Sequence, residues 1–288
     1  MGHSTNAGRS VLVTGASTGI GAACALDLDK LGFRVFAGVR KQADGEALQQ
    51  QASQQLTPVI LDVTLPDTIE QAAAKIEAAV GDDGLFGLVN NAGILVPGPL
   101  ECVALADIRR QFEVNVFGVV SVTQAMLPLL RTARGRIINM GSISGKAAPP
   151  YLGAYSASKF ALESITDVFR MELSRWQIDV SIIEPDTVAT PIWGKLLDTT
   201  LNIGKHLPDT VRQLYEQDLR SMRKSSAKME KTGMSVEYVL RAIRHALTAR
   251  RPKTRYPVGF RTHLACWAAR NLPDRTRDGF MRRAMGMK

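Results

Sequence analysis

The chain has 288 residues, 45% of them hydrophobic and 22% charged, and its three cysteines form no CxxC pair, which argues against a disulfide framework or a zinc site. Its net charge is +9, but residues 241–288 alone hold 13 Lys and Arg against 2 Asp and Glu, so the basicity belongs to the C-terminal part. No apolar run reaches the about 20 residues of a membrane span, and residues 1–8 lack the apolar stretch of a signal peptide, so we expect a cytoplasmic protein. No metal is expected, because no CxxC pair is present.

Short apolar runs alternate with longer amphipathic ones over the first 190 residues. The short runs predict strands at Ser10–Thr14, Arg34–Val39, Pro58–Leu61, Leu85–Asn90, Arg136–Met140 and Asp179–Glu184. The longer runs predict helices at Gly19–Leu31, Pro66–Val80, Asp107–Leu130 and Leu152–Trp176. Strands that are apolar on both faces and separated by helices predict a doubly wound parallel sheet of the Rossmann type, with about seven strands in a single α/β domain.

The pattern changes after Pro191. Residues 191–233 carry charges and methionines without a strand pattern, and we interpret them as a helical substrate lid. Ser235 is a plausible N-cap for a following helix, and Thr254–Val258 is predicted as the last strand. Residues 259–288 form a basic C-terminal extension of the single domain.

A glycine-rich turn follows the first predicted strand, with the sequence Thr14-Gly15-Ala16-Ser17-Thr18-Gly19-Ile20-Gly21. Glycines allow a tight turn and a close approach of the backbone to a pyrophosphate, whose charge the N–H groups of the new helix would face. The alternative is a strand-to-helix turn that binds nothing. The strand–turn–helix context favours a dinucleotide site, with Thr14, Gly15, Ser17, Thr18, Gly19, Ile20 and Gly21 as its residues.

The end of the second predicted strand, Val39-Arg40-Lys41, lacks the carboxylate that would bind a ribose 2′-hydroxyl. Arg40 and Lys41 are instead two cations available to a 2′-phosphate, so we predict NADP(H) over NAD(H). The alternative for this pair is a solvated loop. Asp62, after the third strand, is placed to meet the adenine, or else to cap the helix that follows it.

Tyr155 and Lys159 are four residues apart in a predicted helix and so share one face. An ammonium group near a tyrosine stabilises the phenolate, so the tyrosine can accept an alcohol proton as hydride leaves. Ser142 follows the fifth strand, where its hydroxyl could hold the substrate oxygen, and Asn115 lies unusually inside a long helix. The alternatives are an exposed helix pair, a turn hydroxyl and a satisfied core amide.

Together these residues resemble the classical short-chain dehydrogenase/reductase family. The matching features span residues 10–191 and are TGASTGIG (14–21), Asp62-Val63, NNAG (90–93), Asn115, Ser142, YSASK (155–159) and the Pro185–Thr190 segment. The resemblance implies a catalytic tetrad of Asn115, Ser142, Tyr155 and Lys159. It also implies that Lys159 binds the nicotinamide ribose and that Asn115 holds a water which relays protons to the lysine.

The resemblance further implies the remaining cofactor contacts, which are Val63 and Asn91, Ala92 and Gly93 on the adenosine side and Pro185, Val188 and Thr190 on the nicotinamide side. Members of this type are usually homodimers or homotetramers joined through two long helices. The chain departs from the family at Pro185-Asp186, where Pro-Gly is usual. The role of Asp186 is therefore open.

Within the family, the sequence most resembles the branch of hydroxysteroid, retinol and 3-hydroxybutyrate dehydrogenases. An apolar pocket is expected from Leu95, Val96, Pro97, Tyr151, Leu152, Ile192, Trp193 and Leu196. It suits a lipophilic secondary alcohol or ketone such as a steroid, a retinoid or a lipid-derived compound. A catalytically silent cofactor-binding regulator is the alternative function, and an epimerase or dehydratase would normally have a larger C-terminal domain.

The C-terminal residues 260–288 combine six arginines with Trp267 and Phe280, a composition that can lie on an anionic membrane surface. The alternative is a helix that covers the core and keeps its arginines in solvent. No helix-turn-helix or RNA-binding motif is visible, so a nucleic-acid partner is not expected.

Overall fold

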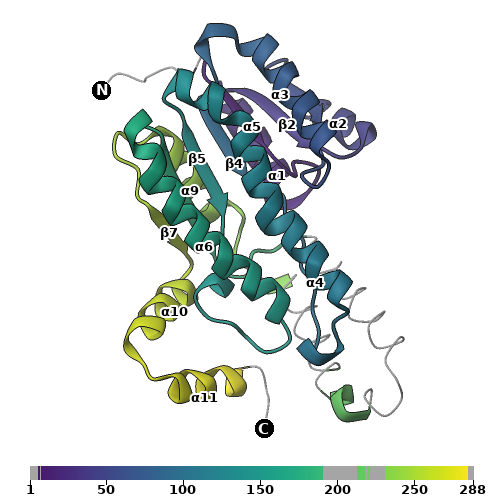
Figure 1. Cartoon of the computed structure of the whole chain (residues 1–288), viewed down its shortest axis with the longest axis vertical. Coiled ribbons are helices and arrows are strands. Elements are labelled where there is room, and N and C mark those ends of the chain that lie inside the picture. Colours follow the sequence, from purple (N-terminus) through teal and green to yellow (C-terminus); the bar gives the residue numbers. More distant parts are fainter. Residues whose placement is uncertain (1–5, 7, 191–212, 218–219, 221–230, 285–288) are drawn as a thin grey trace.

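The computed structural model describes residue 6 and residues 8–190, 213–217, 220 and 231–284. Seven strands form one parallel sheet. Four of them, β2, β4, β5 and β7, are labelled in Figure 1. Their spatial order is β3 (Leu56–Ile60), β2 (Arg34–Val39), β1 (Ser10–Val13), β4 (Gly87–Asn90), β5 (Arg136–Met140), β6 (Asp179–Pro185) and β7 (Arg255–Val258). The predicted doubly wound α/β domain is confirmed.

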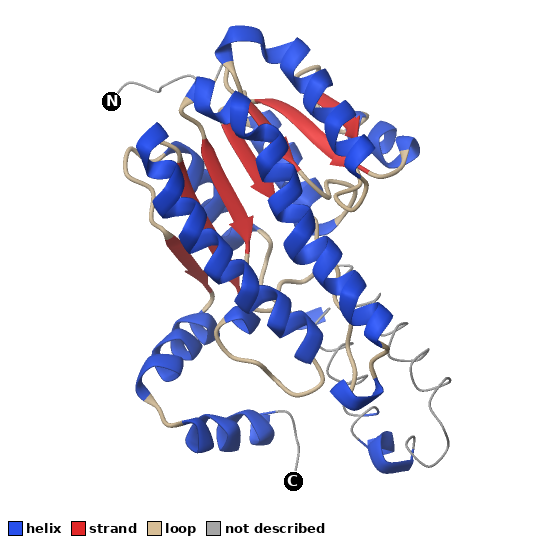
Figure 2. Cartoon of the chain, viewed as in Figure 1, coloured by secondary structure: helices blue, strands red, loops and turns tan. Residues whose placement is uncertain are grey.

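Helices cover both faces of the sheet (Figure 2). One apolar core cluster takes its side chains from the sheet and from α1 (Gly19–Lys30), α2 (Gln42–Gln49) and α9 (Glu237–Thr248). The second cluster joins the sheet to α3 (Pro66–Val80), α5 (Gly118–Ala133) and α6 (Gly153–Leu173). Burial on both sides explains why the central strands read as continuous apolar runs rather than alternating ones.

The strand order reverses between β1 and β4, which are neighbours in the sheet although β2 and β3 separate them in the chain. The connections from these two strands therefore leave in opposite directions at their carboxyl ends. In an open parallel sheet this switch point is where a crevice forms and ligands bind. Thr14 follows β1 and Asn91 follows β4, so both lie at this edge.

The helix predicted at Asp107–Leu130 is interrupted in the structure. It consists of α4 (Leu105–Phe112), the π-helical turn η3 (Glu113–Phe117) and α5. Single π turns often mark functional sites because they shift the side chains that follow. The apolar periodicity alone could not reveal this turn.

The stretch Leu105–Ala133 is the one described helical segment that is long and apolar enough to cross a membrane by length and composition. Half of its most apolar part is buried inside the protein, as in a core helix.

Three local features differ from the sequence expectation. α2 was not predicted, since Gln42–Gln49 is mostly polar and buries only Gly45 and Leu48. β3 begins at Leu56 and contains Pro58, which the sheet tolerates because β3 is an edge strand. The N-cap of α9 is Val236 rather than the predicted Ser235, whose hydroxyl accepts a 3.3 Å hydrogen bond from the N–H of Glu237.

Two further helices, α10 (Phe260–Asn271) and α11 (Asp274–Ala284), extend past the end of β7 (Figure 1). Thr262 is the buried anchor of α10 and donates a 3.0 Å hydrogen bond to the carbonyl of Val258. Phe260, Trp267 and Phe280 are exposed by 81%, 54% and 62%, so these aromatic rings cover no core. The predicted lid, 191–233, falls almost entirely outside the described residues.

Candidate active site

The glycine turn between β1 and α1 is braced by the segment that follows β4. The Thr14 hydroxyl accepts hydrogen bonds from the N–H groups of Asn91 and Ala92, both at 3.0 Å. The Asn91 amide returns two bonds, to the carbonyls of Thr14 at 3.0 Å and Gly15 at 3.1 Å. NNAG therefore fixes the shape of the turn from the neighbouring strand.

Two glycines of this turn have no room for a side chain. Gly15 has a φ of 64°, and a Cβ there would lie 2.8 Å from the Cα of Ala92. A Cβ on Gly21 would lie 2.2 Å from the Gly15 carbonyl oxygen. The N-cap residue Thr18 makes no side-chain hydrogen bond to α1, and the first turn contains no acidic residue. This bare helix N-terminus fits a pyrophosphate.

Arg40 and Lys41 are exposed at the end of β2, and no carboxylate accompanies them in the Val39–Lys41 stretch. Asp62 lies two residues after the end of β3. Its carboxylate accepts a 2.7 Å hydrogen bond from the hydroxyl of Thr64 and a 3.0 Å bond from the Thr64 N–H. Asp62 thus shapes its own turn and leaves the N-cap position of α3 to Leu65.

Asn115 lies in the π turn η3 and is 1% exposed. Its side-chain oxygen accepts from the N–H of Ile94 at 2.9 Å, and its amide nitrogen donates to the carbonyl of the same residue at 3.0 Å. The amide nitrogen also donates to the hydroxyl of Ser158 at 3.2 Å. These bonds tie the π turn both to the segment after β4 and to α6.

Ser158 was not singled out from the sequence, although it connects two of the predicted site residues. Its hydroxyl is buried and donates a 2.7 Å hydrogen bond to the main-chain carbonyl of Tyr155. The chain of contacts therefore runs from Asn115 through Ser158 to the backbone of Tyr155. A small polar residue inside a YSASK helix gives no pattern that would distinguish this role from a surface serine.

Ser142, Tyr155 and Lys159 converge at the carboxyl end of β5. Ser142 is the N-cap of the short 3-10 helix η4 (Ile143–Gly145) and accepts a 3.1 Å bond from the N–H of Ser144. The Ser142 side chain lies close enough to the Tyr155 hydroxyl to favour its ionised form. The Lys159 Nζ lies 5.6 Å from the centroid of the Tyr155 ring.

Burial determines the proton affinities of this group. It lowers the pKa of Lys159 from 10.5 to about 8, because the charged ammonium is removed from water. Burial also raises the pKa of Tyr155, and the hydrogen bond from Ser142 works against that shift. A lysine whose pKa lies this near neutrality can take part in proton transfer, as acid–base chemistry requires.

The segment after β6 is held by backbone hydrogen bonds on both sides. Asp186 donates its N–H to the carbonyl of Val258 at 2.9 Å, and its carboxylate accepts from the N–H of Thr187 at 2.7 Å. Asp186 is not among the residues with positive φ, so an aspartate fits this turn without strain. Val188 forms a parallel bridge with Met234, and Thr190 donates to the Val188 carbonyl at 3.4 Å.

The described part of the expected apolar pocket comes from two segments that meet. Gly98 donates a 2.7 Å hydrogen bond to the carbonyl of Tyr151 and forms a parallel bridge with Leu152. This places Leu95, Val96 and Pro97 on the segment that joins Tyr151. Tyr151 has a φ of 67°, a left-handed conformation that is uncommon for a bulky residue. Ile192, Trp193 and Leu196 lie outside the described residues.

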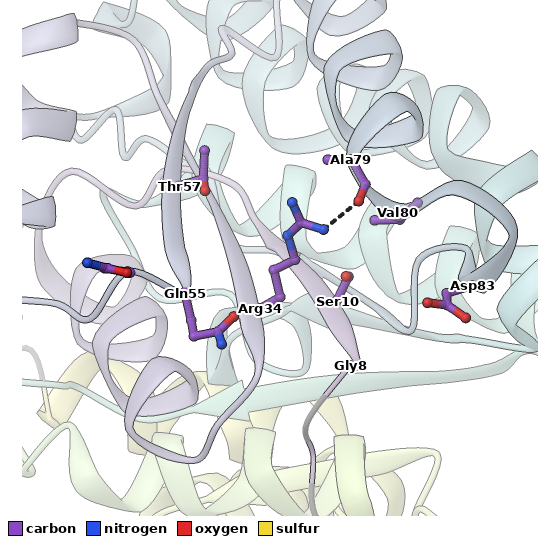
Figure 3. Close-up of a pocket in the computed structure, with 9 residues that line it drawn as sticks. Gly8, Ser10, Arg34, Gln55, Thr57, Ala79, Val80 and Asp83 are labelled. Atoms are coloured by element: carbon purple, nitrogen blue, oxygen red, sulfur yellow. Dashed lines mark hydrogen bonds between the residues drawn. The ribbon is translucent and has the colours of Figure 1, made fainter.

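A cavity of about 400 Å³ lies at the opposite edge of the sheet, where Ser10 and Arg34 begin their strands (Figure 3). Arg34 donates there to the carbonyl of Ala79, so its guanidinium is already engaged. None of the predicted site residues lines this cavity. Among the described residues there is also no group of three His, Cys, Asp or Glu side chains that could hold a metal.

Comparison with known proteins gives the family of the chain. The family model described as short chain dehydrogenase matches residues 9–200. Retinol dehydrogenase 5 from Mus musculus is 37% identical over 94% of this chain and 87% of its own length. The 17-beta-hydroxysteroid dehydrogenase type 2 from Homo sapiens is 36% identical over 96% of this chain and 74% of its own length.

Solved structures share the fold. A short-chain dehydrogenase from Streptomyces avermitilis superimposes with a TM-score of 0.75 at 23% identity, covering 97% of this chain and 98% of its own. One from Burkholderia cenocepacia, in complex with NADP, superimposes with a TM-score of 0.72 at 24% identity, covering 99% of this chain and 100% of its own. The chain belongs to the classical short-chain dehydrogenase/reductase family, in its hydroxysteroid and retinol branch, and is an NAD(P)-dependent oxidoreductase that interconverts alcohols and carbonyl compounds.

Proposed function

We propose that this enzyme uses NADP(H) to interconvert a lipophilic secondary alcohol and its ketone, with Tyr155 as the acid–base group. The observation that carries this assignment is the buried ammonium of Lys159, 5.6 Å from the centroid of the Tyr155 ring, with Ser142 at the same end of β5. A bound nicotinamide supplies hydride exchange. The protein supplies the proton, the orientation and the exclusion of water.

Each residue of the tetrad has a distinct task. Ser142 donates a hydrogen bond to the substrate oxygen, and Tyr155 accepts the alcohol proton in oxidation or donates it in reduction. Lys159 stabilises the phenolate and binds the nicotinamide ribose. Asn115 anchors the π turn and orders the water through which a proton reaches Lys159.

The cofactor contacts are assigned along the carboxyl edge of the sheet. The glycine turn from Thr14 to Gly21 holds the pyrophosphate, the Asp62–Val63 and Asn91–Gly93 segments line the adenosine half, and Pro185, Val188 and Thr190 hold the nicotinamide amide. The preference for NADP(H) rests on Arg40 and Lys41, which are exposed and have no acidic residue beside them in the Val39–Lys41 stretch. Comparing kcat/KM with NADP(H) and NAD(H) tests this preference, and a clear advantage of NAD(H) would refute it.

Lipophilic substrates are supported by the relatives, which are named retinol dehydrogenase and 17-beta-hydroxysteroid dehydrogenase. The segments that carry Val96 and Tyr151 are joined through Gly98, at the start of α6, and add apolar side chains there. A panel of steroids, retinoids and small polyols, followed at the nicotinamide absorbance band, tests the class. The proposal requires turnover of the lipophilic members, and turnover of the polyols alone would reject it. The Tyr155→Phe variant serves as the inactive control.

A homo-oligomer is supported by apolar side chains on the outer faces of α5 and α6. Phe160 is exposed by 46% and Met171 by 62% on α6, and Phe117, the last residue of η3 directly before α5, is exposed by 54%. Burying such side chains against a second copy removes apolar area from water. Light scattering after size exclusion should give a dimer or tetramer, which Phe160→Asp should weaken. Leu31→Asp, at the exposed C-cap position that follows α1, serves as the matched control.

A peripheral membrane contact of this otherwise cytoplasmic enzyme is supported by α10 and α11. Their exposed aromatic rings lie among arginines, a pattern that favours anionic lipid surfaces. Sedimentation with phosphatidylserine vesicles tests it, with phosphatidylcholine vesicles as the uncharged comparison. Phe260→Ser combined with Trp267→Ser should abolish binding, whereas Leu65→Ser, an exposed apolar residue before α3, should not.

A further inference from the structure

A group of charged side chains is buried behind the proposed catalytic residues. We call Glu163 and Glu184 the carboxylate pair. The buried charge cluster consists of this pair with the two cations that contact both of its members, Lys146 and Arg255. The side chains of Glu163 and Glu184 are exposed by only 10% and 1%.

The distances show that the two carboxylates meet at the same cations. Lys146 Nζ lies 2.7 Å from Glu163 Oε2 and 3.2 Å from Glu184 Oε1. Arg255 Nη2 lies 3.2 Å from Glu163 Oε2, and its Nε lies 3.6 Å from Glu184 Oε1. Four groups from α6, β6, β7 and the segment after η4 are thus joined.

The carboxylate pair needs a proton to be satisfied. Glu163 Oε1 and Glu184 Oε1 are both buried, and neither has a hydrogen-bond partner among the donors present in the described residues. The two carboxyl groups contact the same cations, and a hydrogen bond between them requires a proton on one of the two. Burial, this hydrogen bond and repulsion from Glu163 together raise the pKa of Glu184 from 4.5 to about 7, against the opposing effect of Lys146.

The cluster lies where three parts of the active site join. Lys146 directly follows η4, the short helix that Ser142 caps. Glu163 lies one helical turn beyond Lys159 on α6, and Glu184 directly precedes Pro185. The packing is close, because a Cβ on Gly145 would lie 3.1 Å from the Lys159 carbonyl oxygen and 3.4 Å from the Cγ of Glu163.

We propose that the carboxylate pair holds a single proton, and that the buried charge cluster positions the Ser142 loop and α6 against the carboxyl end of β6. This inference rests on the proposed function for the identity of the site that is positioned. Loss of the shared proton leaves two anions in contact, which weakens the contact between α6 and β6. The proposed cofactor-binding segment that starts at Pro185 then shifts in position relative to Lys159.

The elements that pack near Glu184 differ in the charged groups that they bring to it. α6 contributes Glu163 and, behind Arg255, Asp167, whose Oδ2 lies 2.7 Å from Arg255 Nη2 and which also pairs with Arg170. α9, which also packs on β6, buries only apolar side chains. The α10 side chains of Arg261 and His263 are exposed. α6 also carries Lys159, whose pKa burial lowers to about 8, and its titration is common to the wild type and the variants below. A difference between wild type and variant that changes near neutrality is therefore assigned to the pair.

The first test measures stability against pH for Glu184→Gln, which resembles the protonated glutamic acid. A raised pKa means that wild-type stability is full below the unfolded pKa and is lost as the pH rises through about 7. The difference in unfolding midpoint, variant minus wild type, should therefore increase between pH 5 and 8 and then level off. Glu172→Gln, an exposed position on α6, should give a flat difference.

A Glu184→Gln difference that is flat, or that falls with pH, would mean that both carboxylates are ionised in ordinary ion pairs, and would overturn the proposal. Glu163→Gln provides a second variant, with the same rising difference expected, if the first one fails to fold. This measurement needs no cofactor, so its result does not depend on the proposed function.

The second test measures positioning through NADPH affinity by titration at pH 6 and 8.5. The ratio of the wild-type Kd to the Glu184→Gln Kd should rise about fivefold over this range, since only the wild type loses the shared proton. Taking the ratio at each pH cancels the titration of the cofactor and of Lys159. An unchanged ratio, together with the expected stability difference, would confine the pair to a structural role and reject positioning. Absence of NADPH binding in either protein would instead refute the proposed function.

Discussion

Lys159 Nζ donates a 2.7 Å hydrogen bond to the main-chain carbonyl of Met140, the last residue of β5. The bond fixes the ammonium at the carboxyl edge of the sheet, next to Ser142. Lysine is not simply a charge here, because its hydrogen bond to the strand determines where the charge lies.

Replacing Lys159 by Met should lower kcat/KM by about 100-fold or more, since the phenolate of Tyr155 loses its stabilising charge. The same change has a defined effect on stability. A lysine pKa lowered to about 8 penalises the folded state at neutral pH, and the penalty disappears as the pH rises toward the unfolded value of 10.5.

The unfolding midpoint of Lys159→Met relative to wild type should therefore be most favourable near pH 7 and should fall as the pH approaches 10. Denaturant titrations at several pH values measure this. A relative stability that rises with pH would show that burial does not lower the lysine pKa.

Replacing Tyr155 by Phe should reduce kcat about 100- to 10,000-fold while the cofactor Kd changes little, because only the acid–base hydroxyl is removed. Single-turnover absorbance and a fluorescence titration of NADPH separate the two quantities. Ser142→Ala should have a similar but smaller effect. Full activity of Tyr155→Phe with every substrate would refute the assigned mechanism.

Replacing Gly21 by Ala should abolish dinucleotide binding. The added Cβ would lie 2.2 Å from the Gly15 carbonyl oxygen and 2.4 Å from the Asn91 amide nitrogen, so the turn itself must move. Isothermal titration with NADPH measures the loss. Gly279→Ala, where a Cβ meets nothing within 4 Å, is the matched control and should bind normally.

Replacing Arg40 by Asp should lower the ratio of kcat/KM for NADP(H) to that for NAD(H) by about tenfold, the effect of losing one charge-assisted hydrogen bond. Initial rates with both cofactors measure the ratio. Arg250→Asp, at an exposed position after α9, makes the same change of charge away from β2 and should leave the ratio unchanged. An equal response of the two variants would show that the effect is one of overall charge.

Local patterns were sufficient for the sheet and for the glycine turn, because buried strands and tight turns restrict residue types at fixed spacings. The core of each predicted strand lies in the observed sheet, and the expected edge collects Thr14, Asn91 and Ser142. Ser158 and the carboxylate pair could not be predicted. Their meaning depends on which helix face meets which strand, as when Glu163 on α6 meets Glu184 on β6.

The π turn around Asn115 could not be predicted from the sequence either. Its signal, an asparagine inside an apolar helix, is compatible with a satisfied amide in a regular helix. The structure shows that the amide is indeed satisfied, by Ile94 and Ser158, and that the helix is nevertheless irregular. Only the contact between sequence-distant segments distinguishes the two cases.

The bridge between Val188 and Met234 has a consequence for how new specificities can arise. The N–H of Met234 donates to the Thr187 carbonyl at 2.9 Å, and its carbonyl accepts from the N–H of Ala189 at 3.0 Å, so both ends of the intervening chain are fastened at one point. Closing a longer loop costs little extra entropy once its ends are held. Evolution, or an engineer, can therefore exchange the whole interval for one of different length and leave the hydride-transfer chemistry untouched.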